Sequence, residues 1–176
     1  MRISALLLAL ALPVAVHAAA SGAPTATARF QNAQGQAVGE AQLRETPGGV
    51  LLVLSLRSLP PGPHAFHVHD TGKCEGAGGF KSAGGHFNPH TRKHGYESPE
   101  GFHAGDLPNV VVAADGTATV ELLVAGVTLA EGKPNSLFDA DGSALMVHAG
   151  PDDYRTDPAG NAGDRIACGV VEQAKR

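Results

Sequence analysis

NVVVAADGTATVELLVA, residues 109–125, consists of two apolar runs that meet at Asp115-Gly116. An Asp-Gly pair between two such runs is a strong hairpin signal, because glycine readily adopts the positive φ that a tight turn needs. Neither run has the apolar spacing of an amphipathic helix, so both are predicted to be strands. The stretch therefore predicts antiparallel β structure, with strands at 109–115 and 117–125.

The rest of the chain repeats this pattern of short apolar runs between turn residues, with little sustained helical periodicity. The count reaches eight short strands, and the predicted fold class is therefore all-β. Eight antiparallel strands in one domain are typical of a sandwich or a barrel. The other six predicted strands are 26–33, 36–45, 50–58, 64–70, 143–149 and 165–171.

Two segments between the strands, residues 71–108 and 150–164, are long and lack clear periodicity. Loops of this length in a compact domain are generally either functional or disordered. Disorder is the alternative for both segments. Because the first contains Cys74 and several histidines, which can anchor a loop internally, we expect two ordered functional loops.

The first eighteen residues have the features of a secretory signal peptide. Arg2 provides a positive start, 6–16 is an apolar stretch, and a small-residue cleavage site precedes Ala19. An uncleaved anchor is the alternative, but Pro13 interrupts the run, which is also short for a membrane span. We therefore predict cleavage near Ala18/Ala19, export, a single domain at 19–176 and no membrane attachment afterwards.

Charge and cysteine content narrow the class of protein further. The formal net charge is −4 and no basic patch is visible, which argues against a nucleic acid partner. Cys74 and Cys168 are the only two cysteines. Export to an oxidising compartment favours a disulfide between them, whereas two free structural thiols are the alternative.

Histidine is the residue type that points to chemistry, with nine in the chain. HAFHVHD, residues 64–70, places His67 and His69 two positions apart on a predicted strand, so their side chains share one face. Phe66 and Val68 point to the other face. Two neutral imidazoles that converge in this way suit a borderline metal such as copper or zinc.

The first long loop offers a second set of metal-binding side chains. Three imidazoles and a carboxylate there make a plausible tetrahedral set for zinc. Together with the histidines of the strands, the side chains exceed what one ion can hold, so two adjacent metals are predicted. The spacing alone leaves open which ligands belong to which ion. The loop residues are His86, His94, His103 and Asp106, and the further strand-borne histidine is His148.

Several of these motifs, in this order, closely resemble the copper,zinc superoxide dismutases, specifically their exported bacterial branch. The resemblance covers about residues 26–171. It implies an eight-stranded Greek-key β-barrel with two long functional loops over an external metal site. The motifs are HAFHVHD (64–70), SAGGHFNP (82–89), RKHG continuing to FHAGDLPN (92–109), MVHAGPDD (146–153) and GNAGDRIACGVV (160–171).

The resemblance also implies a role for each site residue, with one copper ion and one zinc ion per chain. Asp152 links a copper-ligand histidine to a zinc-ligand histidine, Arg165 attracts the anion at the copper channel, and Cys74 and Cys168 form the family's bridge. His90 matches no ligand position. The copper ligands are His67, His69, His86 and His148, and the zinc ligands are His86, His94, His103 and Asp106.

The implied reaction is dismutation of superoxide to dioxygen and hydrogen peroxide by a redox-cycling copper, bridged through His86 to a structural zinc. An exported protein that buffers or delivers copper and zinc without turnover is the alternative, but storage needs no Arg165. A copper-only relative is disfavoured by the complete zinc set, and a plain adhesion barrel leaves the ligands unexplained. We further expect a bacterial periplasmic location and a monomer or homodimer.

Overall fold

The computed structural model describes residues 23 and 25–174; the predicted signal segment, residues 1–18, lies outside them. This part of the chain forms nine short strands and two 3-10 turns. None of its helices is long and apolar enough to cross a membrane. The elements are β1 (Thr25–Gln31), β2 (Ala37–Thr46), β3 (Gly49–Leu56), β4 (Gly62–His64), β5 (Phe66–His69), η1 (Gly76–Gly78), η2 (Lys81–Ala83), β6 (Val110–Val112), β7 (Ala118–Val124), β8 (Ala144–His148) and β9 (Arg165–Gln173).

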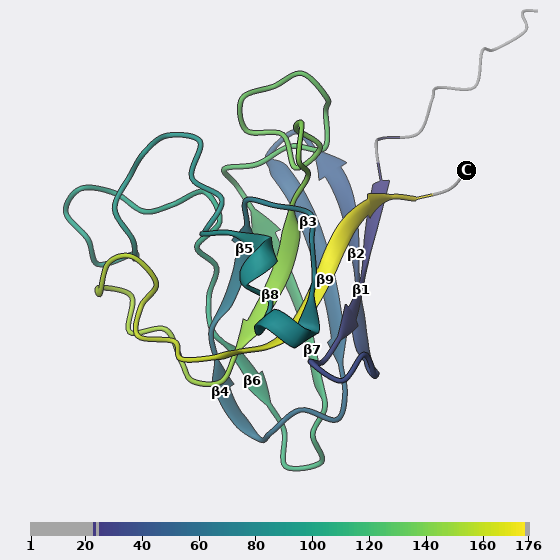
Figure 1. The fold of residues 1–176 in the computed structure, drawn as a ribbon. Coiled ribbons are helices and arrows are strands. Elements are labelled where there is room, and N and C mark those ends of the chain that lie inside the picture. The colour runs from purple at the N-terminus through teal and green to yellow at the C-terminus, as the bar shows by residue number, and fades with distance from the viewer. Residues whose placement is uncertain (1–22, 24, 175–176) are drawn as a thin grey trace, which may run out of the picture.

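The strands form a curled antiparallel sheet (Figure 1). Seven of them follow the order β5-β8-β9-β1-β2-β3-β7, and β4 pairs separately with β6. Because β1 lies beside β9 and β3 beside β7, long connections return the chain to earlier strands, as in a Greek key. The prediction of an all-β Greek-key barrel is confirmed.

The predicted strand 64–70 is divided in two at Ala65. Before this residue β4 pairs with β6, and after it β5 pairs with β8. The Ala65 N–H donates to the carbonyl of Gly150 (2.8 Å), and its carbonyl accepts from the N–H of His148 (2.9 Å). The chain thus changes sheet at a barrel corner, which is why nine strands are present where eight apolar runs were expected.

The predicted hairpin at 109–125 keeps its turn, but its two strands diverge. Gly116 has φ +81°, and the N–H of Ala113 donates to the carbonyl of Thr117 (2.8 Å). Beyond the turn, β7 pairs with β3 over its full length, whereas β6 pairs with β4. Competition from these partners therefore limits the hairpin ladder to the turn itself.

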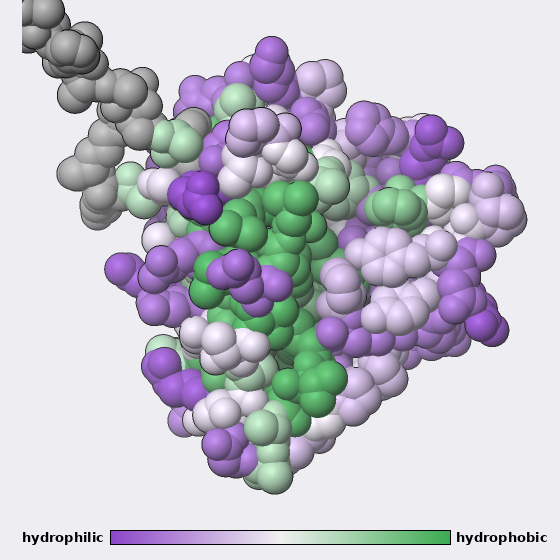
Figure 2. Space-filling view, turned by 180° about the vertical axis from the view of Figure 1, so that it is seen from behind, coloured by the Kyte–Doolittle hydropathy of each residue, from purple (hydrophilic) through white to green (hydrophobic). Residues whose placement is uncertain are grey.

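Alternation along the strands separates the core from the surface. Leu52 and Leu54 of β3 are fully buried, and each such side chain stabilises the fold by roughly 1.5–3 kcal/mol. Val53 between them and Leu123 on β7 face outward and are 37% and 51% exposed. From behind, apolar side chains form a patch in the middle of the barrel (Figure 2).

The two long loops project from the same side of the barrel (Figure 1) and bind each other. The N–H of Glu97 in the first loop donates to the carbonyl of Tyr154 in the second (3.1 Å). The side chain of Asp157 accepts from the backbone N–H of His94 (3.0 Å) and pairs with Lys93 (3.2 Å). The expectation of ordered loops agrees with these contacts, which place the second loop over the histidines of the first.

Candidate metal centre

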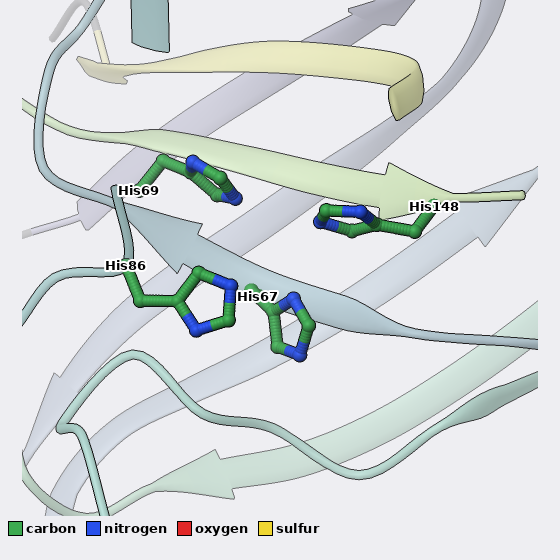
Figure 3. A group of neighbouring side chains, drawn as sticks. All are labelled: His67, His69, His86 and His148. Atoms are coloured by element: carbon green, nitrogen blue, oxygen red, sulfur yellow. The ribbon is translucent and has the colours of Figure 1, made fainter. Parts of the chain in front are cut away.

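Four imidazoles converge on one point beside β5 (Figure 3). His67 and His69 come from β5, His148 ends β8, and His86 comes from the first long loop. Each offers a ring nitrogen, and these four atoms all lie within 4.8 Å of one another. All four residues are buried, with at most 8% of their surface exposed.

The nitrogens that point into this cluster have no hydrogen-bond partner. They are His67 Nδ1 and the Nε2 atoms of His69, His86 and His148. Buried polar atoms almost always have a partner, and among the residues described only one other buried side-chain atom, Ser143 Oγ, lacks one. Because a neutral imidazole nitrogen is also a metal ligand, these four atoms fit a bound metal ion.

The opposite nitrogen of each strand-borne ring makes a hydrogen bond, which selects its tautomer. A ring N–H that donates to a carboxylate or carbonyl leaves the other nitrogen bare for a metal. The donors and acceptors are His67 Nε2 to Asp152 Oδ2 (2.7 Å), His69 Nδ1 to Gly84 O (3.1 Å) and His148 Nδ1 to Gly163 O (3.3 Å).

A second group of four atoms adjoins the first. The Nδ1 atoms of His86, His94 and His103 lie 2.9, 3.0 and 3.1 Å from Asp106 Oδ1, and those of His86 and His103 are 3.4 Å apart. A tetrahedral zinc site with ligands at about 2.0–2.1 Å has edges of about 3.3 Å. The spacing therefore suits zinc, with modest expansion around the carboxylate.

His86 is the residue that the two groups share. Its Nδ1 belongs to the group around Asp106, and its Nε2 is one of the four unpartnered atoms. The other oxygen of Asp106 accepts from the backbone N–H groups of Gly95 (2.9 Å) and His103 (3.0 Å), which fixes the carboxylate. One imidazole can thus contact two metal ions at once.

The electrostatics of the two groups differ. Burial lowers the pKa of His69 well below its usual value, that of His86 to about 4 and that of His148 to about 3, so these rings are neutral at pH 7. Burial also lowers the pKa of His94, but hydrogen bonds to Asp106 and Asp152 outweigh it and raise that pKa to about 9. The surroundings of Asp106 therefore favour positive charge.

Asp152 connects the two groups from behind. Its Oδ2 accepts from His67 Nε2 (2.7 Å) and its Oδ1 from His94 Nε2 (3.0 Å). Burial raises the pKa of Asp152, but hydrogen bonds from both histidines outweigh it and hold that pKa well below its usual value. Asn109 holds the backbone of Asp152, donating to its carbonyl (3.0 Å) and accepting from its N–H (2.8 Å).

A pocket leads to the first group and carries one guanidinium. It is lined by His69, His86, His148 and Arg165, among others. Arg165 Nη1 donates to the carbonyl of Phe80 (2.7 Å) and Nη2 to that of Gly84 (2.6 Å), so the charge is held at the pocket wall. A small anion that enters the pocket meets this charge beside the histidines.

Comparison with known proteins agrees with this geometry. Residues 37–171 match the family described as copper/zinc superoxide dismutase. The chain belongs to the copper/zinc superoxide dismutase family. It is 52% identical to superoxide dismutase [Cu-Zn] 2 of Aquifex aeolicus (83% of this chain, 85% of the relative) and 48% identical to superoxide dismutase [Cu-Zn] of Caulobacter vibrioides (84% and 86%). The crystal structure of a superoxide dismutase-like protein from Bacillus subtilis superposes with a TM-score of 0.79 at 40% identity, covering 83% of this chain and 97% of that one.

The disulfide expected for this member of the family is present. Cys74 in the first loop and Cys168 in β9 are bonded, with their Cα atoms 5.6 Å apart. The bond closes a sequence separation of 94 residues and ties the loop to the strand that begins at Arg165. The prediction of a bridge is confirmed, and its place links the loop to the arginine.

All the ligand side chains predicted for the two metals lie in the two groups, and Asp152 and Arg165 adjoin them. Their individual roles as ligands are proposals. His90, the additional loop histidine, is exposed and belongs to neither group.

Sequence reasoning missed three residues at the centre: Asn109, Phe80 and Gly84. Asn109 is the last residue of the run FHAGDLPN, in which His103 and Asp106 are the side chains that point to a metal. Phe80 and Gly84 act through backbone carbonyls, and these leave no mark in the side-chain pattern.

Proposed function

We infer that the protein dismutates superoxide to dioxygen and hydrogen peroxide, with one copper and one zinc per chain. The observation that carries this conclusion is the set of four buried imidazole nitrogens without partners, joined through His86 to a second group of four potential ligand atoms around Asp106. Membership of the copper/zinc superoxide dismutase family supports the same reaction.

The two groups are assigned to different metals by their donor chemistry. The four-imidazole group, His67, His69, His86 and His148, holds copper, because imidazole suits copper and no carboxylate is present. The group of His86, His94, His103 and Asp106 holds zinc, which favours a tetrahedral set of nitrogen and oxygen donors. Copper, when bound, supplies one-electron redox chemistry, whereas zinc has no accessible redox change.

The protein's own groups bind the substrate and control protons. Arg165 holds the superoxide anion beside the copper ligands and gives a local positive field in a chain of net charge −4. His86 Nε2 is bare and can hold a proton when no metal occupies it, while Nδ1 stays in the group of Asp106. Asp152 keeps His67 and His94 in the tautomers that present Nδ1 to the metals.

The pocket favours turnover over metal storage. A protein that only buffers or delivers copper and zinc has no use for an anion site next to the metal. Here Arg165 is held by two carbonyls at the pocket wall, so its position is specified rather than incidental.

Export to the bacterial periplasm is part of the proposal. The segment 1–18 has the composition of a signal peptide, with cleavage near Ala18/Ala19 and a single mature domain at 19–176. The disulfide between Cys74 and Cys168 supports an oxidising compartment. The mature protein is a monomer or a homodimer.

The decisive experiment measures metal content and superoxide removal on the same purified mature protein. About one copper and one zinc per chain, together with fast superoxide removal that disappears on chelation and returns with copper, is the expected result. A fully loaded protein that binds both metals but removes no superoxide would be a buffering or delivery protein instead.

A further inference from the structure

Phe80 combines an unusual backbone conformation with complete burial, close to the pocket. Its φ is +58° and its ψ +21°, in the left-handed region that side chains other than glycine rarely occupy. None of its surface is exposed. A non-glycine residue keeps such a conformation only where the surrounding structure enforces it, and such residues concentrate at functional sites.

The ring of Phe80 anchors the first loop to the barrel through a small apolar cluster outside the main core. The ring packs with residues of β8, of β9 and of the loop itself, and the disulfide closes the cluster from one side. β8 ends in His148 and β9 begins at Arg165, so the cluster shares its two strands with two residues of the pocket wall. Its buried members are Phe80, Ala83, Ala144, Met146 and Cys168, with Cys74 packed against them.

The backbone of Phe80 places a carbonyl against Arg165. This carbonyl accepts from Arg165 Nη1 (2.7 Å), while Gly84 O accepts from Nη2 (2.6 Å) and also from His69 Nδ1 (3.1 Å). A guanidinium is planar, so two acceptors on separate nitrogens fix both its position and its rotation. With only the hydrogen bond to Gly84, the guanidinium of Arg165 could rotate about that bond and would lose its fixed orientation.

We propose that Phe80 is a positioning residue for the anion that enters the pocket: its buried ring and left-handed backbone hold the carbonyl that orients Arg165. The proposal rests on the proposed function, in which that anion is superoxide. Without the ring, the segment that leads into η2 relaxes toward ordinary φ values, the carbonyl turns away, and the guanidinium swings out of line with the pocket.

The test compares Phe80→Ala with Arg165→Ala, the double variant, and Phe30→Ala as a control. Phe30 is a similarly buried ring that belongs to the main core and not to the cluster of Phe80. Two quantities are measured on copper- and zinc-loaded protein: the superoxide rate constant against ionic strength, and the affinity for azide by optical titration. Loss of a steering charge lowers association rates by about 10- to 1000-fold. The superoxide rate constant of Phe80→Ala is therefore expected to fall by about tenfold at low salt, with a flatter salt dependence and weaker azide binding.

The double variant separates positioning from general destabilisation. If Phe80 acts through Arg165, its substitution has no further effect on rate or azide affinity in the Arg165→Ala background. Phe30→Ala is expected to keep both within about twofold of wild type once metal content is matched. An equal loss from Phe80→Ala in both backgrounds, or unchanged azide affinity, overturns the proposal.

A second pair of variants covers the case in which Phe80→Ala does not fold or load copper. Leucine and isoleucine have equal volume, but the β-branch of isoleucine opposes the left-handed backbone. Phe80→Leu is expected to bind azide nearly as wild type and Phe80→Ile several-fold more weakly; equal affinities would refute the backbone role. If loaded wild type removes no superoxide, the proposed function fails, while the azide comparison still decides the role of Phe80.

Discussion

Asp152→Asn is the substitution that best separates the two metal groups, because it changes one oxygen of a shared carboxylate. Oδ1 accepts from two N–H groups, those of His94 (3.0 Å) and of the Tyr154 backbone (2.7 Å), whereas Oδ2 accepts only from His67 (2.7 Å). An amide nitrogen cannot accept from either donor at Oδ1. The asparagine therefore keeps its oxygen there and places its NH2 group against His67.

The consequence for His67 follows from its tautomer. Nε2–H now faces another donor, so the proton moves to Nδ1, which is one of the four unpartnered nitrogens of the first group. A hydrogen bond to a charged group contributes about 1.5–3 kcal/mol. This corresponds to a loss of about 10- to 100-fold in copper affinity, the range typical for residues that orient a metal ligand. Zinc affinity is expected to fall less, since His94 keeps its acceptor.

The assay is competition with chelators of known affinity, performed for copper and zinc separately on the metal-free protein. Asp115→Asn is the control, because it removes the same charge from the exposed turn between β6 and β7. A larger loss for zinc than for copper, or affinities equal to those of the control, would refute the tautomer argument.

Three further perturbations test other parts of the site. Arg165→Ala is expected to keep both metals but slow superoxide removal by at least about tenfold and flatten its dependence on ionic strength, whereas loss of copper would make the arginine structural. His94→Ala removes one corner of the group around Asp106 and leaves all four unpartnered nitrogens, so metal analysis should find zinc depleted and copper retained; loss of both would contradict separate sites. Replacing Cys74 and Cys168 by serine should lower the free energy of unfolding of the metal-free protein by roughly 4–5 kcal/mol in denaturant titrations, the value for a closed loop of 94 residues, and an unchanged midpoint would show that the bridge adds no stability.

Local sequence patterns determined most of the strands. The predicted run 50–58 corresponds to β3 (Gly49–Leu56), and 165–171 to β9 (Arg165–Gln173), because alternation and turn residues act over a few neighbouring positions. The division of 64–70 at Ala65 was not predictable in this way. It depends on hydrogen bonds to Gly150 and His148, both more than 80 positions away.

The same distinction applies to the metal centre. Side-chain periodicity placed His67 and His69 on one face, and the content of the first long loop supplied the other ligand types. The resemblance then assigned each side chain to copper or zinc. Which nitrogen each ring presents was decided only in the folded protein, since that depends on the acceptor behind the ring: Asp152 for His67 and the Gly84 carbonyl for His69.

The sequence by itself thus determined the all-β class, the bridge between Cys74 and Cys168 and the residue types available for metals. Only the tertiary structure decided the tautomers of the histidines, the two hydrogen bonds between Asn109 and the backbone of Asp152, and the hydrogen bond from Arg165 to the Phe80 carbonyl. The physical reason is that strand formation and the type of metal ligand depend on a side chain and on its neighbours in the sequence. A hydrogen bond to a backbone group exists only once remote segments have been brought together, and every residue carries the same backbone atoms.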